Sequence, residues 1–480
     1  MKIFNFLKNQ YFWLAIILLI GLSVRLYKID TALADWHSWR QADTAAVARN
    51  FYVEGFNPLY PRADDMGVAS VTGRANLERL RFVEFPIYNS LVYFAYVLNG
   101  GIDIKLARLV AIAFSLGSTV FIYLITKRYS NVMVALLASF LYAVLPFNVF
   151  FSRTILPEPS LVFFSLGMLY FVDKWIYEKR IYLFILAVIF TSSALLIKPT
   201  AAFYLLPVLY SYWIVERKII PPLKYFIYLG LSFLPLVLWR LWIMQYPEGI
   251  PAFEWLMNGN NIRFKPAFFR WILHDRFGRE ILSVSGTILF AIGLLKKPEG
   301  RENFFLHIFA FSSLLYLVVF ATGNVQHDYY QYFIVPALVI FVARGLAYLI
   351  SGGKDLLPKI VSIPLALLLI YLTLGLTWYE VRGFYQINDN SIIIAGEAAD
   401  KILPKSARVV APYGGSTSFL YYINRPGFAY IPGPIDEVID KYNINYYVAV
   451  SYDEDTKNIM KKYKVIEQTP KYVIVDLSQK

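Results

Sequence analysis

The sequence predicts a polytopic α-helical membrane protein of about eleven spans, followed by a small α/β domain. Three observations support this fold class. Of the 480 residues, 58% are hydrophobic and only 16% are charged, whereas a soluble chain of this length carries about 25% charged residues. Long apolar runs recur along most of the chain, and they stop after Tyr379. A mean hydropathy of +0.50 agrees with this class.

The spans come first. A helix needs roughly 20 mostly apolar residues to cross a bilayer. The first apolar run lacks a small-residue cleavage site and is followed by basic residues, so we interpret it as a retained span and not as a signal peptide. The predicted spans are 11–27, 106–126, 131–150, 157–174, 181–197, 200–216, 222–243, 280–296, 303–322, 330–350 and 358–378.

Positive charge sets the expected orientation. The pairs Lys127-Arg128, Lys179-Arg180 and Arg217-Lys218 fall in every second short connection between spans. Cytoplasmic loops carry this excess of Lys and Arg, so the N-terminus is expected in the cytoplasm of a plasma (inner) membrane, with the C-terminal end outside. The net charge of +13 therefore reflects span ends facing the lipid bilayer, and we expect no nucleic-acid partner. The absence of cysteine excludes disulfides, thiolate metal sites and a cysteine nucleophile.

One apolar segment is too short to be a span. Residues 86–99 cover only about 21 Å as a helix, which is typical of an interfacial or re-entrant helix. We therefore place it on the outer surface, within a first outer loop at 28–105. The expected domains are a transmembrane domain at 1–382, which includes this loop, and an extracytoplasmic domain at 383–480. Polar segments at 152–159 and 323–330 are expected on the same outer face.

The C-terminal domain is expected to alternate strands and helices. Short apolar runs at 407–411, 446–450 and 472–475 indicate buried strands, and the runs at 435–442 and 454–462 indicate helices between them.

The first outer loop carries the strongest functional signal. It contains Asp35, His37, Arg40 and Asp43 among tryptophans, and ionisable groups beside a bilayer are functional candidates. Asp43, near the start of a helical stretch at 42–54, is our candidate general base. The structural alternative is an acid that stabilises the first turn of that helix. Asp35 is the competing base, because spacing alone does not separate the two.

Other candidates lie at outer span ends. Glu84 could bind a metal or simply pair with Arg81, and Glu158, between two prolines, needs a cation or a metal, with Arg153 as a local partner. His327 precedes Asp328 and could ligate a metal or act as a base. We therefore expect a divalent metal cation at Glu84, Glu158 and His327. The candidate substrate-binding residues are Arg40, Arg108, Arg153, Lys198, His37 and Tyr330, of which Lys198 could equally be a snorkelling anchor and Tyr330 an aromatic-belt residue.

In these motifs the chain resembles the GT-C glycosyltransferase superfamily, and within it the branch related to protein O-mannosyltransferases and the aminoarabinose transferase of lipid A. The resemblance covers the spans from 11 to about 350. The motifs that carry it are a first span ending at Arg25, Val47-Ala48-Arg49-Asn50, Glu84-Phe85-Pro86-Ile87-Tyr88, Arg108-Leu109, Ser152-Arg153 with Pro157-Glu158-Pro159, and Lys198-Pro199-Thr200.

The resemblance implies an inverting glycosyltransferase, a hexosyl or pentosyl transferase, that moves a sugar from a polyprenyl-phosphate donor to an acceptor on the outer face. It also implies that the first-loop acid is the base, that outer acids hold a divalent cation in many members, and that Arg or Lys neutralises the leaving phosphate. The sequence departs from the family at Arg40-Gln41, where members carry an Asp-Glu pair, and at Ile87, where a second proline is common. The alternative function is a transporter or flippase of a lipid-linked glycan, which predicts midplane charges and internal repeats that we do not find.

Overall fold

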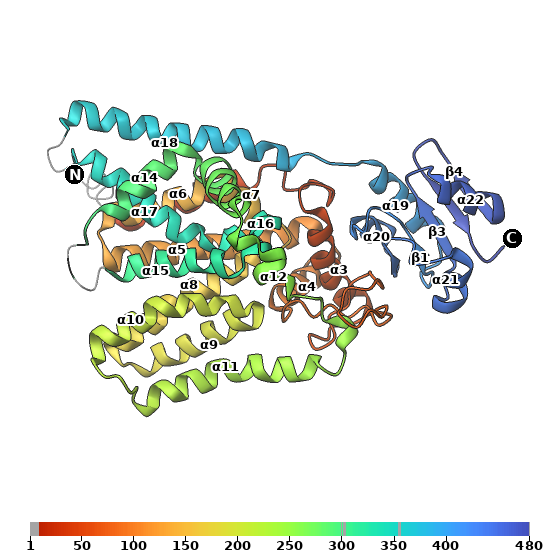
Figure 1. Cartoon of the computed structure of the whole chain (residues 1–480), viewed down its shortest axis with the longest axis horizontal. Coiled ribbons are helices and arrows are strands. Elements are labelled where there is room, and N and C mark those ends of the chain that lie inside the picture. Colours follow the sequence, from red (N-terminus) through yellow and green to blue (C-terminus); the bar gives the residue numbers. More distant parts are fainter. Residues whose placement is uncertain (1–8, 299, 301–303, 354–356, 480) are drawn as a thin grey trace. The chain divides into compact units, whose positions relative to one another are not determined.

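A computed structural model describes residues 9–298, 300, 304–353 and 357–479 of the chain. The chain divides into two compact units, which Figure 1 labels by element. The first unit comprises residues 1–29, 109–239 and 253–383, and the second comprises residues 30–108, 240–252 and 384–480. The first outer loop, which the sequence analysis groups with the spans, therefore belongs to the same unit as the C-terminal residues.

The first unit is helical. Each of the eleven segments predicted as spans is helical over most of its length. The helices that correspond to these segments are α2 (Gln10–Arg25), α5 (Ile104–Tyr129), α6 (Val132–Val144) with α7 (Pro146–Phe151), α8 (Glu158–Glu178), α9 (Ile181–Ile197), η1 (Pro199–Tyr204) with α10 (Leu205–Glu216), α11 (Leu223–Ile243), α14 (Ser283–Leu295), α15 (Phe304–Val319), η5 (Asp328–Ile334) with α17 (Val335–Ile350), and α18 (Lys359–Val381). The last residues of α11 and the first of α5 fall in the second unit.

These helices differ in whether they are long enough to cross a membrane. Among the described residues, five helices are long and apolar enough to cross a membrane, and the pair Pro266–Ile281 with Ser283–Leu295, bent by 106°, would make a sixth. Shorter apolar helices are Gln10–Arg25, Val132–Val144, Ile181–Ile197 and Phe304–Val319. The predicted membrane helices are therefore present, while the number of crossings remains a prediction.

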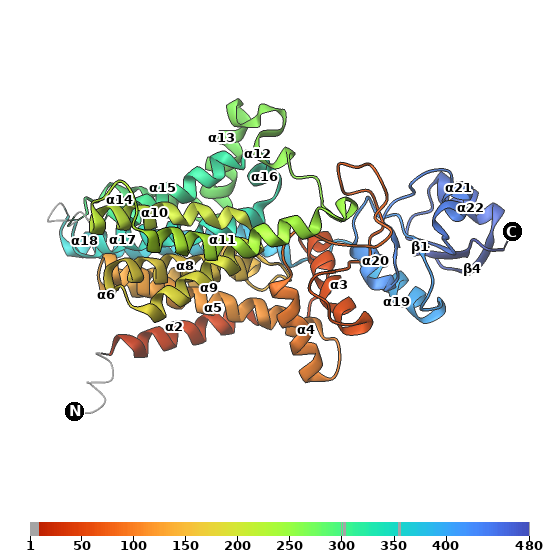
Figure 2. The ribbon, with the colours of Figure 1, turned by 90° about the horizontal axis from the view of Figure 1, so that it is seen from below.

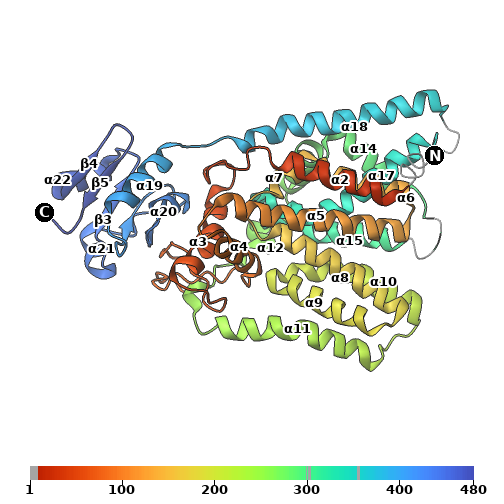
Figure 3. The same cartoon turned by 180° about the vertical axis from the view of Figure 1, so that it is seen from behind.

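Small residues allow these helices to pack closely, as in many membrane bundles. A Cβ added to Gly293 on α14 would lie 1.8 Å from the carbonyl oxygen of Phe341 on α17, and one added to Gly345 would lie 2.0 Å from the carbonyl oxygen of Leu289. The two backbones therefore touch directly. Other neighbouring pairs are α8 with α9, visible in Figure 2, and α2 with α6, visible in Figure 3.

The remaining elements of the first unit are short. They are α12 (Trp255–Asn258), η3 (Gly259–Phe264), α13 (Pro266–Phe269), the π-helix η4 (Arg270–Ile281) and α16 (Ala321–Gln326). The turn η6 (Arg382–Tyr385) follows α18.

The second unit contains a five-stranded mixed sheet in the order β2-β1-β3-β5-β4. β1 pairs in parallel with β2 and β3, whereas β5 pairs antiparallel with β3 and β4. The strands are β1 (Val409–Val410), β2 (Gly427–Phe428), β3 (Tyr446–Ala449), β4 (Lys464–Gln468) and β5 (Val473–Asp476), and the helices of its C-terminal part are α19 (Ser391–Ile402), α20 (Ser418–Ile423), α21 (Ile435–Tyr442) and α22 (Glu454–Lys462). The predicted strands and both predicted helices of this region are confirmed.

Two apolar cores cover the two faces of the sheet. Residues of α19 and α20, such as Ala395 and Phe419, pack in one core, and Val438 of α21 and Ile459 of α22 pack in the other. The first loop contributes Ala34 to the first core and Met66 to the second. The loop is therefore built into the hydrophobic interior of this unit.

The loop also extends the sheet at the edge formed by β2. Asp65 forms a parallel bridge with Gly427. The Gly427 N–H donates to the Asp64 carbonyl oxygen at 3.0 Å, and the Met66 N–H donates to the Gly427 carbonyl oxygen at 2.7 Å. These hydrogen bonds satisfy an edge that would otherwise be open, so the loop is held in register with the C-terminal strands.

Candidate active site

The helix that carries Asp43 is polar yet buried. α3 (Ser38–Glu54) begins four residues earlier than the predicted stretch, and every residue from Arg40 to Phe51 is buried. Alanines at several of these positions leave room for the surrounding chain. A buried polar group costs free energy unless it is paired, so the partners of these side chains decide what α3 can do. Asp43 lies beyond the first turn, which argues against a purely helix-stabilising role.

Two ion pairs join α3 to the segment before α4 (Ile87–Asn99). Arg81 Nη2 donates to Asp43 Oδ2 at 2.5 Å. Arg40 Nη2 donates to both oxygens of Glu84, at 2.9 and 2.8 Å. The interpretation that pairs Glu84 with Arg81 is therefore wrong. Arg81 instead holds Asp43, a pairing that sequence separation hides because the two residues are 38 positions apart.

These four side chains line one small cavity of about 10 Å³ together with Pro61 and residues of α3 and α4. Asp43 is 3% exposed, and its Oδ1 makes no hydrogen bond among the described residues. The ion pair thus fixes one oxygen of the carboxylate and leaves the other for a further donor. This arrangement suits a general base that accepts a proton from a hydroxyl group.

Asp35 occupies a different environment. Its side chain is fully buried, and Oδ1 accepts a hydrogen bond from Gln41 Nε2 at 2.7 Å. The guanidinium of Arg108, also fully buried, lies 3.9 Å from Oδ2. Asp35 therefore fixes the turn that leads into α3. His37 occupies the N-cap position with φ 55°, in the left-handed region, and its carbonyl oxygen accepts from the backbone N–H groups of Arg40 and Gln41.

Asp64, an acid that the sequence does not single out, anchors the other end of α3. Asp64 accepts hydrogen bonds from the guanidinium of Arg49 and, at 3.2 Å, from Asn50 Nδ2. Arg49 also donates to the Tyr421 carbonyl oxygen at 2.8 Å and stacks over the Tyr421 ring, 4.7 Å from its centroid. Tyr421 of α20 (Ser418–Ile423) therefore holds the C-terminal part of α3 through Arg49. The two adjacent acids Asp64 and Asp65 are the feature of the sequence from which this ion pair could have been suspected.

Asp65, next to Asp64 in the same loop, is an acid whose pKa is raised. Its pKa is raised to about 6, chiefly by burial and also by the neighbouring charges of Asp43 and Asp64, against the lowering effect of the Gly67 N–H and Arg81. The side chain accepts a hydrogen bond from the Gly67 N–H at 2.9 Å. Its protonation state therefore changes near neutral pH.

A second polar cluster lies in the first unit. Glu158, 2% exposed in the first turn of α8, accepts a hydrogen bond from Lys198 Nζ through Oε1. Its Oε2 is buried and has no hydrogen-bond partner in the described chain. Lys198 Nζ lies 4.8 Å from the ring centroid of Tyr330 and 5.9 Å from that of Tyr329. The partner of Glu158 is thus Lys198, and the expected pairing with Arg153 is wrong.

Arg153 and Arg25 hold the C-terminal end of the first span. Arg153 is fully buried and donates to the Lys28 carbonyl oxygen at 3.0 Å. Arg25 donates to Ser152 Oγ at 2.7 Å and to the Ala143 carbonyl oxygen at 2.6 Å. The Ser152-Arg153 motif therefore has a structural role in holding the end of α2.

His327 sits among aromatic rings. Its ring centroid lies 5.8, 5.4 and 5.6 Å from those of Trp255, Tyr329 and Tyr330. The neighbouring Asp328 lies 4.0 Å from Arg276 Nη1. This surrounding is a packed aromatic cluster rather than a set of metal ligands.

The expected metal site does not fit the residues present. Both oxygens of Glu84 are engaged by Arg40 and one oxygen of Glu158 by Lys198. Within the described ranges, no three His, Asp or Glu side chains come together as a set that could hold an ion.

Comparisons with known proteins place this arrangement in a fold. Residues 86–242 match the family model for dolichyl-phosphate-mannose-protein mannosyltransferase. The crystal structure of ArnT from Cupriavidus metallidurans in the apo state is similar to the chain with a TM-score of 0.65 and 13% identity, and the match covers 96% of this chain and 97% of that one. The chain shares the fold of this ArnT structure. The resemblance stated from the sequence is confirmed.

Two further structures share the fold. ArnT from the same organism bound to undecaprenyl phosphate matches with a TM-score of 0.60, 14% identity and coverage of 96% of this chain and 97% of that one. The oligosaccharyltransferase of Archaeoglobus fulgidus in the apo form matches with a TM-score of 0.60 and 11% identity, covering 92% of this chain and 70% of that one. A structure of that oligosaccharyltransferase is a complex with Zn and sulfate. No curated protein sequence matches the chain.

The apolar helices and the similarity to ArnT support a multi-pass membrane protein with an ArnT-like fold. At these levels of identity the structural similarity establishes the fold alone.

Proposed function

We propose that the protein is an inverting glycosyltransferase that transfers a sugar from a polyprenyl-phosphate donor to an acceptor on the outer face of the membrane, with Asp43 as the general base. The observation that carries the proposal is the carboxylate of Asp43, buried on α3 and fixed through one oxygen by Arg81. Asp35 is the weaker candidate because it is fully buried and bound to Gln41.

The proposed reaction is a single displacement at the anomeric carbon. An acceptor hydroxyl gives its proton to Asp43 as its oxygen attacks that carbon, and the bond from the carbon to the donor's phosphate oxygen breaks. The electron pair leaves with the polyprenyl phosphate, so the configuration inverts. A base in place contributes about 10²–10⁴-fold to such a step.

The leaving phosphate gains negative charge and needs a cation. Lys198, in the first unit, is the candidate that the sequence resemblance offers for this role. Its ammonium lies against the Tyr330 ring and is shared with Glu158, so a phosphate could take over the contact that the carboxylate makes. The Arg40–Glu84 pair we assign to shaping the cavity around Asp43, because an Arg–carboxylate fork fixes both side chains.

The topology completes the proposal. We place the N-terminus in the cytoplasm of the plasma (inner) membrane and the second unit, with α3 and the C-terminal sheet, outside the cell. A divalent metal remains an expectation from the resemblance, and no residue of the chain is assigned to it.

The test is donor consumption by the purified protein in liposomes. A panel of polyprenyl-phosphate sugars is supplied with cell-envelope extract as acceptor, and release of polyprenyl phosphate is measured for wild type, Asp43→Asn and Asp35→Asn. The proposal expects turnover that Asp43→Asn abolishes. An Asp43→Asn protein as active as wild type would refute Asp43 as the base.

A further inference from the structure

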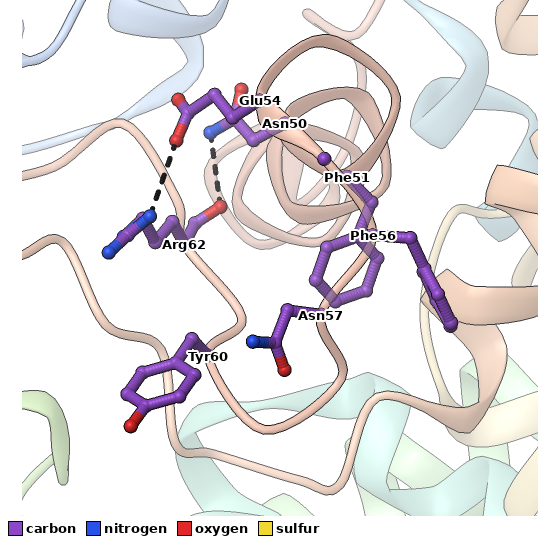
Figure 4. Close-up of a pocket in the computed structure, with 8 residues that line it drawn as sticks. Asn50, Phe51, Glu54, Phe56, Asn57, Tyr60 and Arg62 are labelled. Atoms are coloured by element: carbon purple, nitrogen blue, oxygen red, sulfur yellow. Dashed lines mark hydrogen bonds and ion pairs between the residues drawn. The ribbon is translucent and has the colours of Figure 1, made fainter.

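A concave feature of the second unit lies at the far end of α3 from Asp43. It is a cavity of about 460 Å³, within the range of about 300–1,000 Å³ that small-molecule sites occupy. Residues of the α3 end and of the segment after it line the cavity, and Figure 4 shows them. Nothing in the proposed mechanism uses this space.

The lining combines aromatic rings with neutral hydrogen-bonding groups. In Figure 4 the ring of Tyr60 lies on one side of Asn57, and the rings of Phe51 and Phe56 lie on the other. Asn57 Oδ1 accepts from the Leu59 N–H at 3.1 Å, while its Nδ2 makes no hydrogen bond within the part of the chain that the structure describes. An amide donor is therefore presented between aromatic surfaces.

The aromatic rings are held in place before any ligand arrives. Phe56 stacks on Tyr93 with ring centroids 4.6 Å apart, and Tyr60 places its hydroxyl 3.1 Å from that of Tyr246. Tyr60 also meets Trp242 edge-on at 5.6 Å. A rigid lining loses little entropy on binding, which favours affinity.

The charges at the rim cancel. Glu54 accepts from Arg79 at 2.9 and 2.8 Å and lies 3.9 Å from Arg62. Arg62 in turn lies 3.7 Å from Glu78. Two acids and two guanidinium groups leave no net charge to attract a phosphate or another anion, so the chemistry favours a neutral polyhydroxylated ligand.

The cavity adjoins the one at Asp43. Tyr60 and Arg62 line the larger cavity, and Pro61 between them lines the smaller one. Along α3 the positions of Asp43 and Glu54 are separated by about 16 Å at helical rise. A ligand that reaches both must be longer than one monosaccharide. Gly55 ends α3 with φ 110° and has no atom within 4 Å of a Cβ position, which keeps the mouth open.

We infer that this cavity is a glycan subsite, which binds a neutral sugar unit of an oligosaccharide acceptor some units away from the hydroxyl that reacts. Sugar rings present C–H faces that stack on aromatic side chains and hydroxyls that pair with amides. The ligand's role as acceptor rests on the proposed function, but the binding itself does not. The acceptor class would then be an extended glycan.

The test measures glycan binding without catalysis. Full-length protein in nanodiscs, fluorescently labelled, is applied to an array of neutral and anionic microbial oligosaccharides. Wild type and Asp43→Asn are expected to bind the same neutral glycans. Tyr60→Ala should weaken binding about tenfold, which corresponds to about 1.4 kcal/mol, whereas Tyr60→Phe should retain it because the ring remains.

Tyr52→Ala is the matched control, because Tyr52 is an α3 tyrosine outside the cavity, and its binding should equal that of wild type. The inference is overturned if no neutral glycan binds, if anionic glycans bind in preference, or if Tyr60→Ala binds like wild type. Donor consumption, measured separately, reports on the proposed function. Binding that depends on Tyr60 with no donor consumption would remove the transferase and keep the site.

Discussion

Replacing Asp65 by Asn should stabilise the second unit at neutral pH and not at pH 4. Burial raises the pKa of Asp65 to about 6 from the ordinary 3.8, so the folded protein disfavours its charged form. Stability from this group is present while it is protonated and falls as pH rises from about 4 to 6. Asn is neutral throughout, and its side-chain oxygen can still accept from the Gly67 N–H.

The size of the stabilisation follows from the difference between the folded and ordinary pKa of Asp65. A difference of about two pKa units corresponds to about 3 kcal/mol at most, and partial exposure of Asp65 reduces this to about 1–3 kcal/mol through solvent screening. At about 2–4 °C per kcal/mol, the apparent Tm of Asp65→Asn should exceed that of wild type by roughly 2–12 °C at pH 7.5.

The assay is thermal unfolding in detergent at several pH values, expressed as the Tm difference between variant and wild type. Asp453→Asn is a control of opposite sign. Asp453 caps α22 by accepting from the Thr456 N–H, and that hydrogen bond lowers its pKa. Its stabilisation is present above its ordinary pKa and lost as pH falls. A Tm difference for Asp65→Asn that stays constant from pH 4 to 7.5 would refute the reasoning.

Three further outcomes are expected. Arg40→Lys should lower donor turnover about tenfold to a hundredfold without loss of folding, because a lysine cannot form the two-pronged contact with Glu84. Circular dichroism measures the folding and donor consumption measures the turnover, and a fully active variant would contradict this prediction. Lys198→Gln should weaken donor binding about tenfold or more, measured as KM, whereas an unchanged KM would remove its phosphate role. Gly293→Ala should destabilise the helices of the first unit by about 3 kcal/mol or more, since its Cβ would overlap a carbonyl of α17. Gly375→Ala is the control, because open space surrounds its Cβ position. Equal melting temperatures for the two variants would contradict the close packing.

Much of the fold could be predicted because its signals are local. Helix α21 spans the predicted range, since Pro434 precedes it and Asn443 ends it in the left-handed conformation. The membrane helices follow from uninterrupted apolar runs. The two-residue strands β1 and β2 carry little signal of their own, and pairing across the sheet defines them.

The candidate site was only half predictable, because its ion pairs join residues that are far apart in the sequence. The sequence places Asp43 on a helix, and Arg40 and Glu84 beside it in the chain's polar segments, but which cation meets which acid is decided by tertiary contacts. Arg81 pairs with Asp43 across 38 positions. Asp64 was overlooked because its partner Arg49 also lies on another segment, 15 positions away.

The proposed mechanism depends most directly on Asp43. The decisive measurement is release of polyprenyl phosphate from a polyprenyl-phosphate sugar by wild type, Asp43→Asn and Asp35→Asn in liposomes, each checked for folding by its melting temperature. The account predicts a loss of about 10²–10⁴-fold in turnover for Asp43→Asn at an unchanged melting temperature, and a lowered melting temperature for Asp35→Asn. Undiminished turnover by a folded Asp43→Asn protein would contradict it.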